Sequence, residues 1–215
     1  EFGRDILLRI IWGIRYSLFM GMIAIIGAII IGTVIGSVAG FYKKVDNVIM
    51  RCMDVLLAIP SILLATAIVA ALGPSLPNVV IAIGLANIPQ FARIVRASVL
   101  TIKGQEYIEA ARAMGASDLR IIAKYIIPNS MAPLIVQGSV GVASAILSIA
   151  SLSFVGLGVQ PPTPEWGAML SNARTYMRDA WHITVMPGAA IMLSILSLNI
   201  IGDGLRDALD PRLKN

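Results

Sequence analysis

The chain has 215 residues, of which 57% are hydrophobic and 13% charged, and its mean hydropathy is +0.83. Soluble domains carry about 25% charged residues, so this composition excludes an ordinary soluble domain and predicts an all-α membrane protein, a polytopic helical bundle. The net charge of +5 does not indicate nucleic acid as a partner. Lys and Arg concentrated on the cytoplasmic side of a membrane protein account for it.

Four stretches without a charged residue, 16–42, 55–92, 125–164 and 180–202, are long enough to cross a bilayer, which takes about 20 residues. The second of them is too long for one span. The predicted spans cover about residues 17–41, 53–72, 78–100, 130–153 and 181–203. Gly73-Pro-Ser-Leu-Pro77 separates the second span from the third, because Gly and Pro break helices. Most of the 17 Lys and Arg residues then fall on one side of the membrane, which predicts a cytoplasmic C-terminus and an N-terminus outside.

The chain begins Glu-Phe-Gly-Arg-Asp, without Met and without a signal-peptide pattern. A protein that starts in the cytoplasm would need one more span before this point, so we expect a sixth, N-terminal span to be missing. The Gly- and Pro-rich extracytoplasmic loop, residues 154–180, is expected to cap the outer mouth and to hold a short amphipathic helix at 165–178. Trp12, Trp166 and Trp181 are predicted as anchors at the outer interface.

Residues 101–127 form a charged segment between apolar stretches. Gly104 and Gly115 bound a predicted helix over 105–114, and Ser117 is a suitable N-cap for a second helix, which is expected to end before Pro128. Small side chains on the first helix would let another protein approach its backbone. From the residues alone, the segment is either a knob that receives force from a soluble partner or a plain helical loop.

This segment resembles the EAA loop in the membrane subunits of binding-protein-dependent ABC importers. That pattern is Glu-Ala-Ala, three residues, Gly, nine residues, then Ile-x-Leu-Pro. The residues that match in identity and spacing are Glu109, Ala110, Ala111, Gly115 and Pro128. Tyr125 and Ile127 depart from the pattern at its Ile and Leu positions. The resemblance implies a coupling helix that docks on a cytoplasmic ATPase, and we expect Gly115 where a side chain would clash.

Other stretches resemble the dipeptide/oligopeptide/nickel permease subfamily, and within it the second of two permease subunits. They are Gly3–Asp5, Asp54–Pro60, Ala92–Arg96, Leu152–Gly167 and Gly202–Pro211. The resemblance implies peptide import across the bacterial cytoplasmic membrane by alternating access. It implies three kinds of partner besides the lipid bilayer: a second homologous permease, two cytoplasmic P-loop ATPases and an extracytoplasmic solute-binding protein. ATP and Mg would bind those ATPases, and this chain would hold no cofactor.

The sequence contains none of the motifs His-Glu-x-x-His, Gly-x-Ser-x-Gly or Walker A, so no catalytic residue and no enzyme activity is predicted. His182 and Cys52 are single and far apart, which argues against a metal site. Import of nickel or another small solute by the same machinery stays open as an alternative. A self-assembled passive channel or a membrane scaffold is the alternative from a different class of protein.

Gly32, Gly36 and Gly40 recur every fourth residue and predict a helix-packing face, either between subunits or within the bundle. Asn87 and Gln90 are polar residues inside a predicted span. They either line the translocation path or make a hydrogen bond between helices.

Three charged residues near the inner span ends also carry expectations. Asp54 is expected to pair with Arg51, three residues away on one helical face. Arg93 and Arg96 are expected to extend toward the lipid headgroups, and contact with an ATPase or a gate stays open as the alternative.

Overall fold

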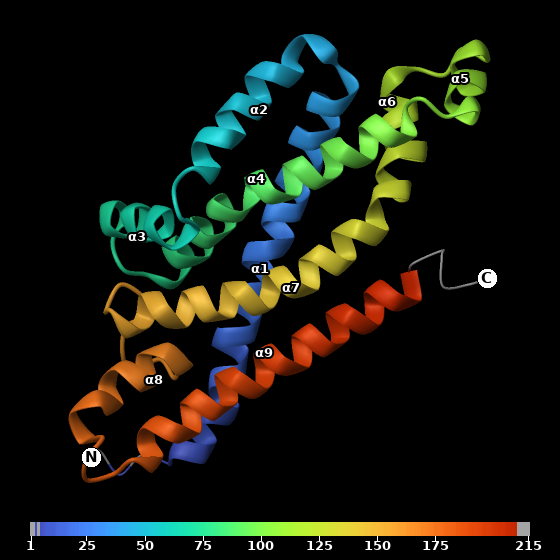
Figure 1. Cartoon of the computed structure of the whole chain (residues 1–215). Helices are drawn as coiled ribbons and strands as arrows, with labels where there is room; N and C mark the ends of the chain where they lie inside the picture. Colours follow the sequence, from blue (N-terminus) through green and yellow to red (C-terminus); the bar gives the residue numbers. More distant parts are fainter. Residues whose placement is uncertain (1–2, 4, 210–215) are drawn as a thin grey trace.

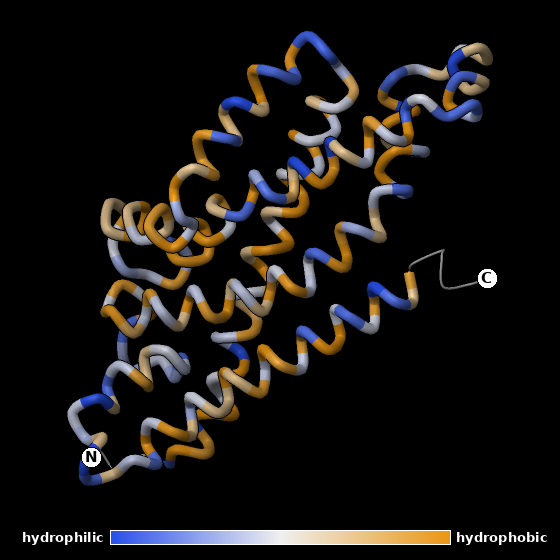
Figure 2. The backbone as a smooth tube through the Cα atoms, viewed as in Figure 1, coloured by the Kyte–Doolittle hydropathy of each residue, from blue (hydrophilic) through white to orange (hydrophobic). Residues whose placement is uncertain are grey.

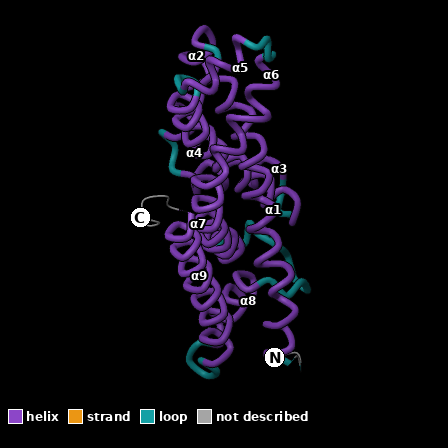
Figure 3. The backbone as a smooth tube through the Cα atoms, turned by 90° about the vertical axis from the view of Figure 1, so that its right-hand side faces the viewer, coloured by secondary structure: helices purple, strands orange, loops and turns teal. Residues whose placement is uncertain are grey.

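The computed structural model describes residue 3 and residues 5–209, and within this part of the chain every regular element is a helix. Arg4, Asp210 and Pro211, which belong to the motifs at the two ends of the chain, lie outside the described residues. The helices form an elongated bundle (Figures 1 and 3). The all-α prediction is therefore confirmed.

Four long helices make up most of the bundle (Figure 1). They are α1 (Ile6–Phe41), α4 (Leu76–Ile102), α7 (Ile127–Phe154) and α9 (His182–Leu209). The shorter elements are α2 (Lys43–Leu57), α3 (Ser61–Leu72), α5 (Glu106–Ala113), α6 (Asp118–Ile121), the π-helix η1 (Ile122–Ile126), α8 (Trp166–Ala173) and the 3₁₀-helix η2 (Arg174–Tyr176).

Four of the helical stretches are long and apolar enough to cross a membrane, and α2 with α3 makes a fifth if the pair is counted as one broken span. The two helices meet at 85°, so residues 53–72 do not form one continuous helix. Pro60 stands at the break with ψ of 129°, as the N-cap of α3. It has no N–H to continue α2, and its ring clashes with the preceding turn of a helix.

The core forms where α1 packs along α4, the most extensive helix pair in the bundle. A side chain at Gly36 would collide with the carbonyl of Ala92, and a Cβ at Gly40 would lie 2.7 Å from the Cβ of Val99. Gly32 faces Phe91 in the same way. The structure thus places the three glycines on a seam within this chain, where small residues let two backbones approach closely.

The expectation that a helix ends before Pro128 is wrong. α6, η1 and α7 follow one another without a break, and the N–H of Ile127 bonds to the carbonyl of Ile122, five residues earlier. In a regular α-helix the proline ring would clash with the carbonyl four residues before it. The wider π turn leaves room for the ring, so the helix passes through Pro128.

The bundle has two ends, which hold different short helices. α2, α5 and α6 lie at one end, and α8 lies with the start of α1 at the other (Figures 1 and 3). Hydrophilic residues gather along α2 and around α5, whereas α3 is mostly hydrophobic (Figure 2). We call the end with α2, α5 and α6 the coupling-segment end, after residues 101–127, and the opposite end the α8 end.

At the α8 end, the long loop is fixed to α1 by buried polar contacts. Glu165 is fully buried, and its carboxylate accepts the N–H groups of Gly167 (2.9 Å) and Ala168 (2.8 Å) as the N-cap of α8. The hydroxyl of Ser17 on α1 donates to the same carboxylate at 3.4 Å.

Trp166 is also buried, and its Nε1 donates to the carbonyl of Ile10 at 3.0 Å. The prediction of Trp166 as an interfacial anchor is therefore wrong, while Trp12 and Trp181 are exposed. The indole lies against α1 because Gly13 has no side chain there; a Cβ at Gly13 would lie 2.7 Å from the indole nitrogen.

Candidate coupling site

The coupling segment, residues 101–127, begins where α4 ends and turns back through α5 to α6. After Ile102 the chain closes a turn with the N–H of Gln105 bonded to the carbonyl of Ile102 at 3.0 Å. α5 then starts with Glu106 and Glu109 in its first turn, where carboxylates stabilise the positive end of the helix dipole. Its predicted bounds, 105–114, differ from the observed Glu106–Ala113 by one residue at each end.

α5 buries one face and exposes the other. Ile108 and Ala111 are buried, at 0% and 2% exposed, and their spacing of three positions places both on one side of the helix. Glu109 and Ala110 are exposed. Ala111 therefore packs inside the protein, so its side chain cannot form part of an external surface.

The turn after α5 is a Schellman motif. The N–H of Ala116 bonds to the carbonyl of Ala111 at 3.0 Å, and the N–H of Gly115 bonds to the carbonyl of Arg112 at 2.9 Å. Gly115 has φ of +82°, a conformation that other residues rarely adopt, and a Cβ there would meet no atom within 4 Å. The expectation that a side chain at Gly115 would clash is wrong, because backbone conformation and not space requires the glycine.

Two contacts hold the second half of the segment. The hydroxyl of Ser117 accepts the N–H of Arg120 at 3.4 Å as the N-cap of α6. The rings of Tyr107 on α5 and Tyr125 on η1 lie 6.2 Å apart. Tyr125, the departure from the EAA pattern, thus contacts α5. Pro128 lies beyond η1 in the first turn of α7, apart from the tip formed by α5 and α6.

Sequence reasoning missed two residues at this tip. Met114 and Leu119 are 81% and 77% exposed, the highest values among the exposed large hydrophobic residues of the described chain. They flank the Gly115 turn and accompany the exposed Glu109 and Ala110. A signal was present, because apolar residues on both sides of a polar turn are unusual unless something covers them.

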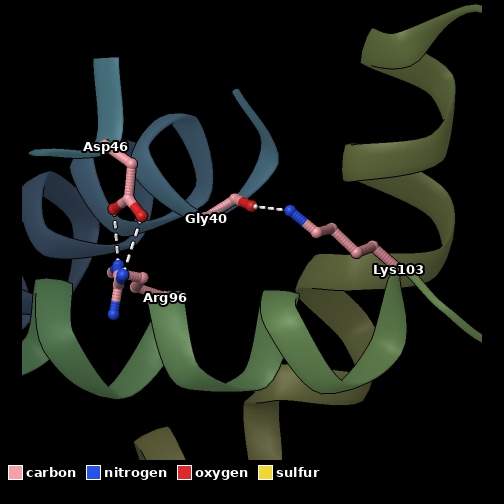
Figure 4. A network of polar contacts seen from close by, with 4 residues as sticks. All are labelled: Gly40, Asp46, Arg96 and Lys103. Atoms are coloured by element: carbon pink, nitrogen blue, oxygen red, sulfur yellow. Dashed lines mark hydrogen bonds and ion pairs between the residues drawn. The ribbon is translucent and has the colours of Figure 1, made fainter. Parts of the chain in front are cut away.

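Charged residues of α2 pair with charged residues of α4. Arg93 donates to Asp54 at 2.7 Å, so the expected pair of Asp54 with Arg51 is wrong. Arg96 makes two hydrogen bonds to Asp46, at 2.5 and 2.7 Å (Figure 4). Neither arginine needs to extend toward headgroups, because the carboxylates of α2 lie within reach.

The turn between α1 and α2 contacts the coupling segment as well. Lys103 donates to the carbonyl of Gly40 at 2.7 Å (Figure 4), and the guanidinium carbon of Arg112 lies 5.3 Å from the centre of the Phe41 ring. Local desolvation and the carboxylate of Asp118 raise the pKa of Tyr42 above its usual value. The last turn of α1 therefore touches the coupling segment at two points, Gly40 and Phe41.

The polar residues considered for a translocation path lie elsewhere, on α4. The side-chain amide of half-buried Asn87 donates to the carbonyl of Ile83 in the same helix at 2.8 Å, whereas Gln90 is exposed. In the described part of the chain, no group of three or more His, Cys, Asp or Glu side chains could hold a metal ion. The coupling segment is thus the best-defined candidate site.

Comparison with known proteins identifies the family of the chain. The family model described as "Binding-protein-dependent transport system inner membrane component" matches residues 28–215. A "Di/tripeptide transport system permease protein" of Pseudomonas aeruginosa is 51% identical over all of this chain and 71% of its own length. A "Dipeptide transport system permease protein" of Alkalihalophilus pseudofirmus is 52% identical over the same shares, and a "Glutathione transport system permease protein" of Pectobacterium atrosepticum is 49% identical over 99% of this chain and 71% of its own length.

Solved structures share the fold. An inward-facing structure of the MetNI methionine ABC transporter matches 95% of this chain and 96% of its own, with a TM-score of 0.75 at 19% identity. An amino acid ABC transporter matches 94% of this chain and 95% of its own, with a TM-score of 0.70 at 16% identity. The extent of the family match, taken with the close relatives, shows that the chain belongs to the family of binding-protein-dependent transport system inner membrane components.

Proposed function

We propose that this chain is a permease subunit of an ATP-driven importer that carries small peptides across the bacterial cytoplasmic membrane by alternating access. The observation that carries the proposal is the similarity to relatives named as di/tripeptide and dipeptide transport permeases, 51% and 52% identical over the whole of this chain. Glutathione is a second candidate substrate, because relatives named as glutathione transport permeases are 49% identical.

Energy for this transport comes from other chains. These 215 residues contain no Walker A motif, so ATP and Mg belong to two P-loop ATPase subunits. A second, homologous permease and an extracytoplasmic solute-binding protein complete the assembly. The coupling segment and the C-terminus of the chain face the cytoplasm, and the α8 end faces outward, as the distribution of Lys and Arg favours.

The exposed tip of the coupling segment is the surface that meets an ATPase. It consists of Glu109, Ala110, Met114, Gly115 and Leu119, all exposed, around one tight turn. Two apolar side chains with a small residue between them suit a shallow groove on a partner, where buried apolar anchors supply most of the binding energy. Buried Ile108 and Ala111 hold the tip against the bundle.

Movement of the tip would tilt the long helices between inward- and outward-open arrangements, a rigid-body change around a central path. Asn87 and Gln90 stay candidates for the lining of that path. The seam of Gly32, Gly36 and Gly40 would keep α1 and α4 moving together. Atoms of α4 fill the space beside these glycines, so sliding along the seam would bring bulkier residues of α1 into collision with α4.

The assembly is tested by gentle co-purification. The chain is tagged at its C-terminus and extracted from native membranes in mild detergent, and the proteins that elute with it are identified by mass spectrometry. A second permease and P-loop ATPases are the expected partners. Recovery of the chain alone, as a stable oligomer, would contradict the importer and favour a self-assembled channel or a scaffold.

The substrate is tested with the complete complex in proteoliposomes. The probes are a radiolabelled dipeptide, glutathione and nickel ion, each offered with the binding protein on one side and ATP on the other. ATP-dependent uptake of the dipeptide is expected. Uptake of nickel without peptide would overturn the substrate assignment, and flux that does not need ATP would overturn the mechanism.

A further inference from the structure

The coupling segment contacts a helix to which it is not joined in sequence. α4 and α7 continue directly into the segment, but the last turn of α1 lies about 60 residues before it. Even so, Lys103 and Gly40, which are 63 positions apart, are linked by a hydrogen bond of 2.7 Å (Figure 4). We call residues 40–46, which join α1 to α2, the α1–α2 corner.

Lys103 holds this corner at a chemically suitable point. The last carbonyls of a helix lack partners within the helix and carry the negative end of its dipole. The half-buried ammonium group of Lys103 supplies both a donor and a positive charge to the carbonyl of Gly40. Any displacement of the start of the coupling segment therefore pulls directly on the end of α1.

A second contact comes from α5. Arg112 lies over the Phe41 ring at 5.3 Å, within the range of a cation–π interaction. Two consecutive residues at the end of α1 are thus held by different parts of the coupling segment: Gly40 by its start and Phe41 by its first helix.

The far side of the corner is fixed to α4. Asp46 and Arg96 form a bidentate ion pair whose side chains are only 16% and 31% exposed, and Gly40 lies against Val99 with no room for a Cβ. A bidentate arginine–carboxylate pair holds its two elements in a defined orientation. The corner therefore moves with α4 when the coupling segment moves.

We propose that the coupling segment moves α1 as well as α4 and α7, and that it does so through the α1–α2 corner. Lys103 and Arg112 are the positioning residues that transmit its movement to α1. This inference rests on the proposed function. Docking on the ATPase would move α4 and α7 through the chain itself, and α1 through these two cations. α1 and α4 would then tilt as one unit, as their close packing through Gly36 requires.

The test uses the complete transporter in proteoliposomes and measures dipeptide imported against ATP hydrolysed in the same sample. In the double variant Lys103→Met with Arg112→Gln, the ratio of uptake to hydrolysis is expected to fall by about 2- to 30-fold, the range seen when a coupling network is altered. The amount of ATPase in the purified complex is expected to stay constant. The conservative variant Lys103→Arg, which keeps the positive charge, is expected to retain the wild-type ratio of uptake to hydrolysis.

Matched controls separate this role from general damage. Arg120→Gln removes another exposed cation of the coupling segment. Asp54→Asn removes the ion pair between Asp54 on α2 and Arg93 on α4, whose side chains are 49% and 57% exposed and which lies outside the corner. Both are expected to keep the wild-type ratio. Asp46→Asn is expected to lower it, and the exchange Asp46→Arg with Arg96→Asp is expected to recover part of it.

A wild-type ratio in the Lys103 and Arg112 double variant would overturn the inference. Loss of the ATPase from that variant would also overturn it, because the two cations would then serve docking and not transmission. Failure of the wild-type complex to import the dipeptide would instead count against the proposed function, so the two failures are distinguishable.

Discussion

The two ends of the bundle both connect long helices through a loop and a helix of eight residues, but they fix that helix in opposite ways. α8 is held by buried groups: Glu165 and Trp166 are 0% and 2% exposed and bond to α1 and to the helix itself. α5 buries only Ile108 and Ala111 and exposes the rest. The α8 end is thus built as part of the core, whereas most of α5 is exposed.

The largest expected effect comes from removing Trp166. Trp166→Ala would delete a buried ring and its hydrogen bond to Ile10, and should lower the free energy of unfolding by about 3–5 kcal/mol. Trp181→Ala removes a ring that is 64% exposed and should change it by no more than about 0.5 kcal/mol. Thermal unfolding in detergent measures both. Equal losses would show that the α8 end is not the packed end.

The cap of α8 should come next in size. Glu165→Ala leaves the N–H groups of Gly167 and Ala168 buried without their acceptor, at a cost of about 2 kcal/mol in unfolding free energy. Glu109→Ala on exposed α5 is the matched control and should leave the unfolding midpoint close to that of the wild type. A larger loss for Glu109 than for Glu165 would contradict the comparison.

A smaller, local effect is expected at the turn after α5. Gly115→Ala must adopt φ near +82°, which costs about 1–2 kcal/mol, and should speed hydrogen exchange over residues 106–116. Gly104→Ala is matched, because a Cβ at either glycine meets no atom within 4 Å and only Gly115 has positive φ. Exchange in the Gly104 variant should be unchanged. If both variants speed exchange equally, the turn does not depend on backbone conformation.

The smallest effect on folding, but a clear one on assembly, is expected at the exposed tip. Met114→Ser with Leu119→Ser should leave the unfolding midpoint unchanged, since both side chains are more than three-quarters exposed. Binding of the ATPase should weaken by about tenfold, as when an apolar anchor is lost from an interface. Pull-down of the ATPase at several concentrations measures this. Unchanged binding would mean that another surface of the segment makes the contact.

The sequence predicted the fold where local signals and membrane chemistry act together. The long apolar stretches gave four helices, although α1 begins 11 residues before its expected span and α9 ends six residues after its own. Gly104, Gly115 and Ser117 placed α5 and the start of α6 within a residue or two. The family assignment, now shown by the match over residues 28–215, followed from the spacing of Glu109, Gly115 and Pro128. Helix caps and turns are local, so a sequence specifies them well.

Prediction failed where a neighbouring helix supplied what the local sequence lacked. Asp54 pairs with Arg93, 39 residues away, and not with nearby Arg51. Glu165 looks like an ordinary loop carboxylate, yet the N–H groups of α8 and the hydroxyl of Ser17 make its burial possible. Pro128 was read as a helix end because a π turn before a proline leaves no simple trace in the sequence.

By itself, the sequence determined that this protein is a helical membrane bundle, where its chain turns, and which family's coupling motif it carries, because hydropathy and turn residues act over a few positions. Only the tertiary structure decided which charges meet, which face of α5 is buried, and that the end of α1 rests on the coupling segment. Those outcomes depend on helices that are distant in sequence and adjacent in space, and a buried polar group takes whatever partner the packing brings within reach.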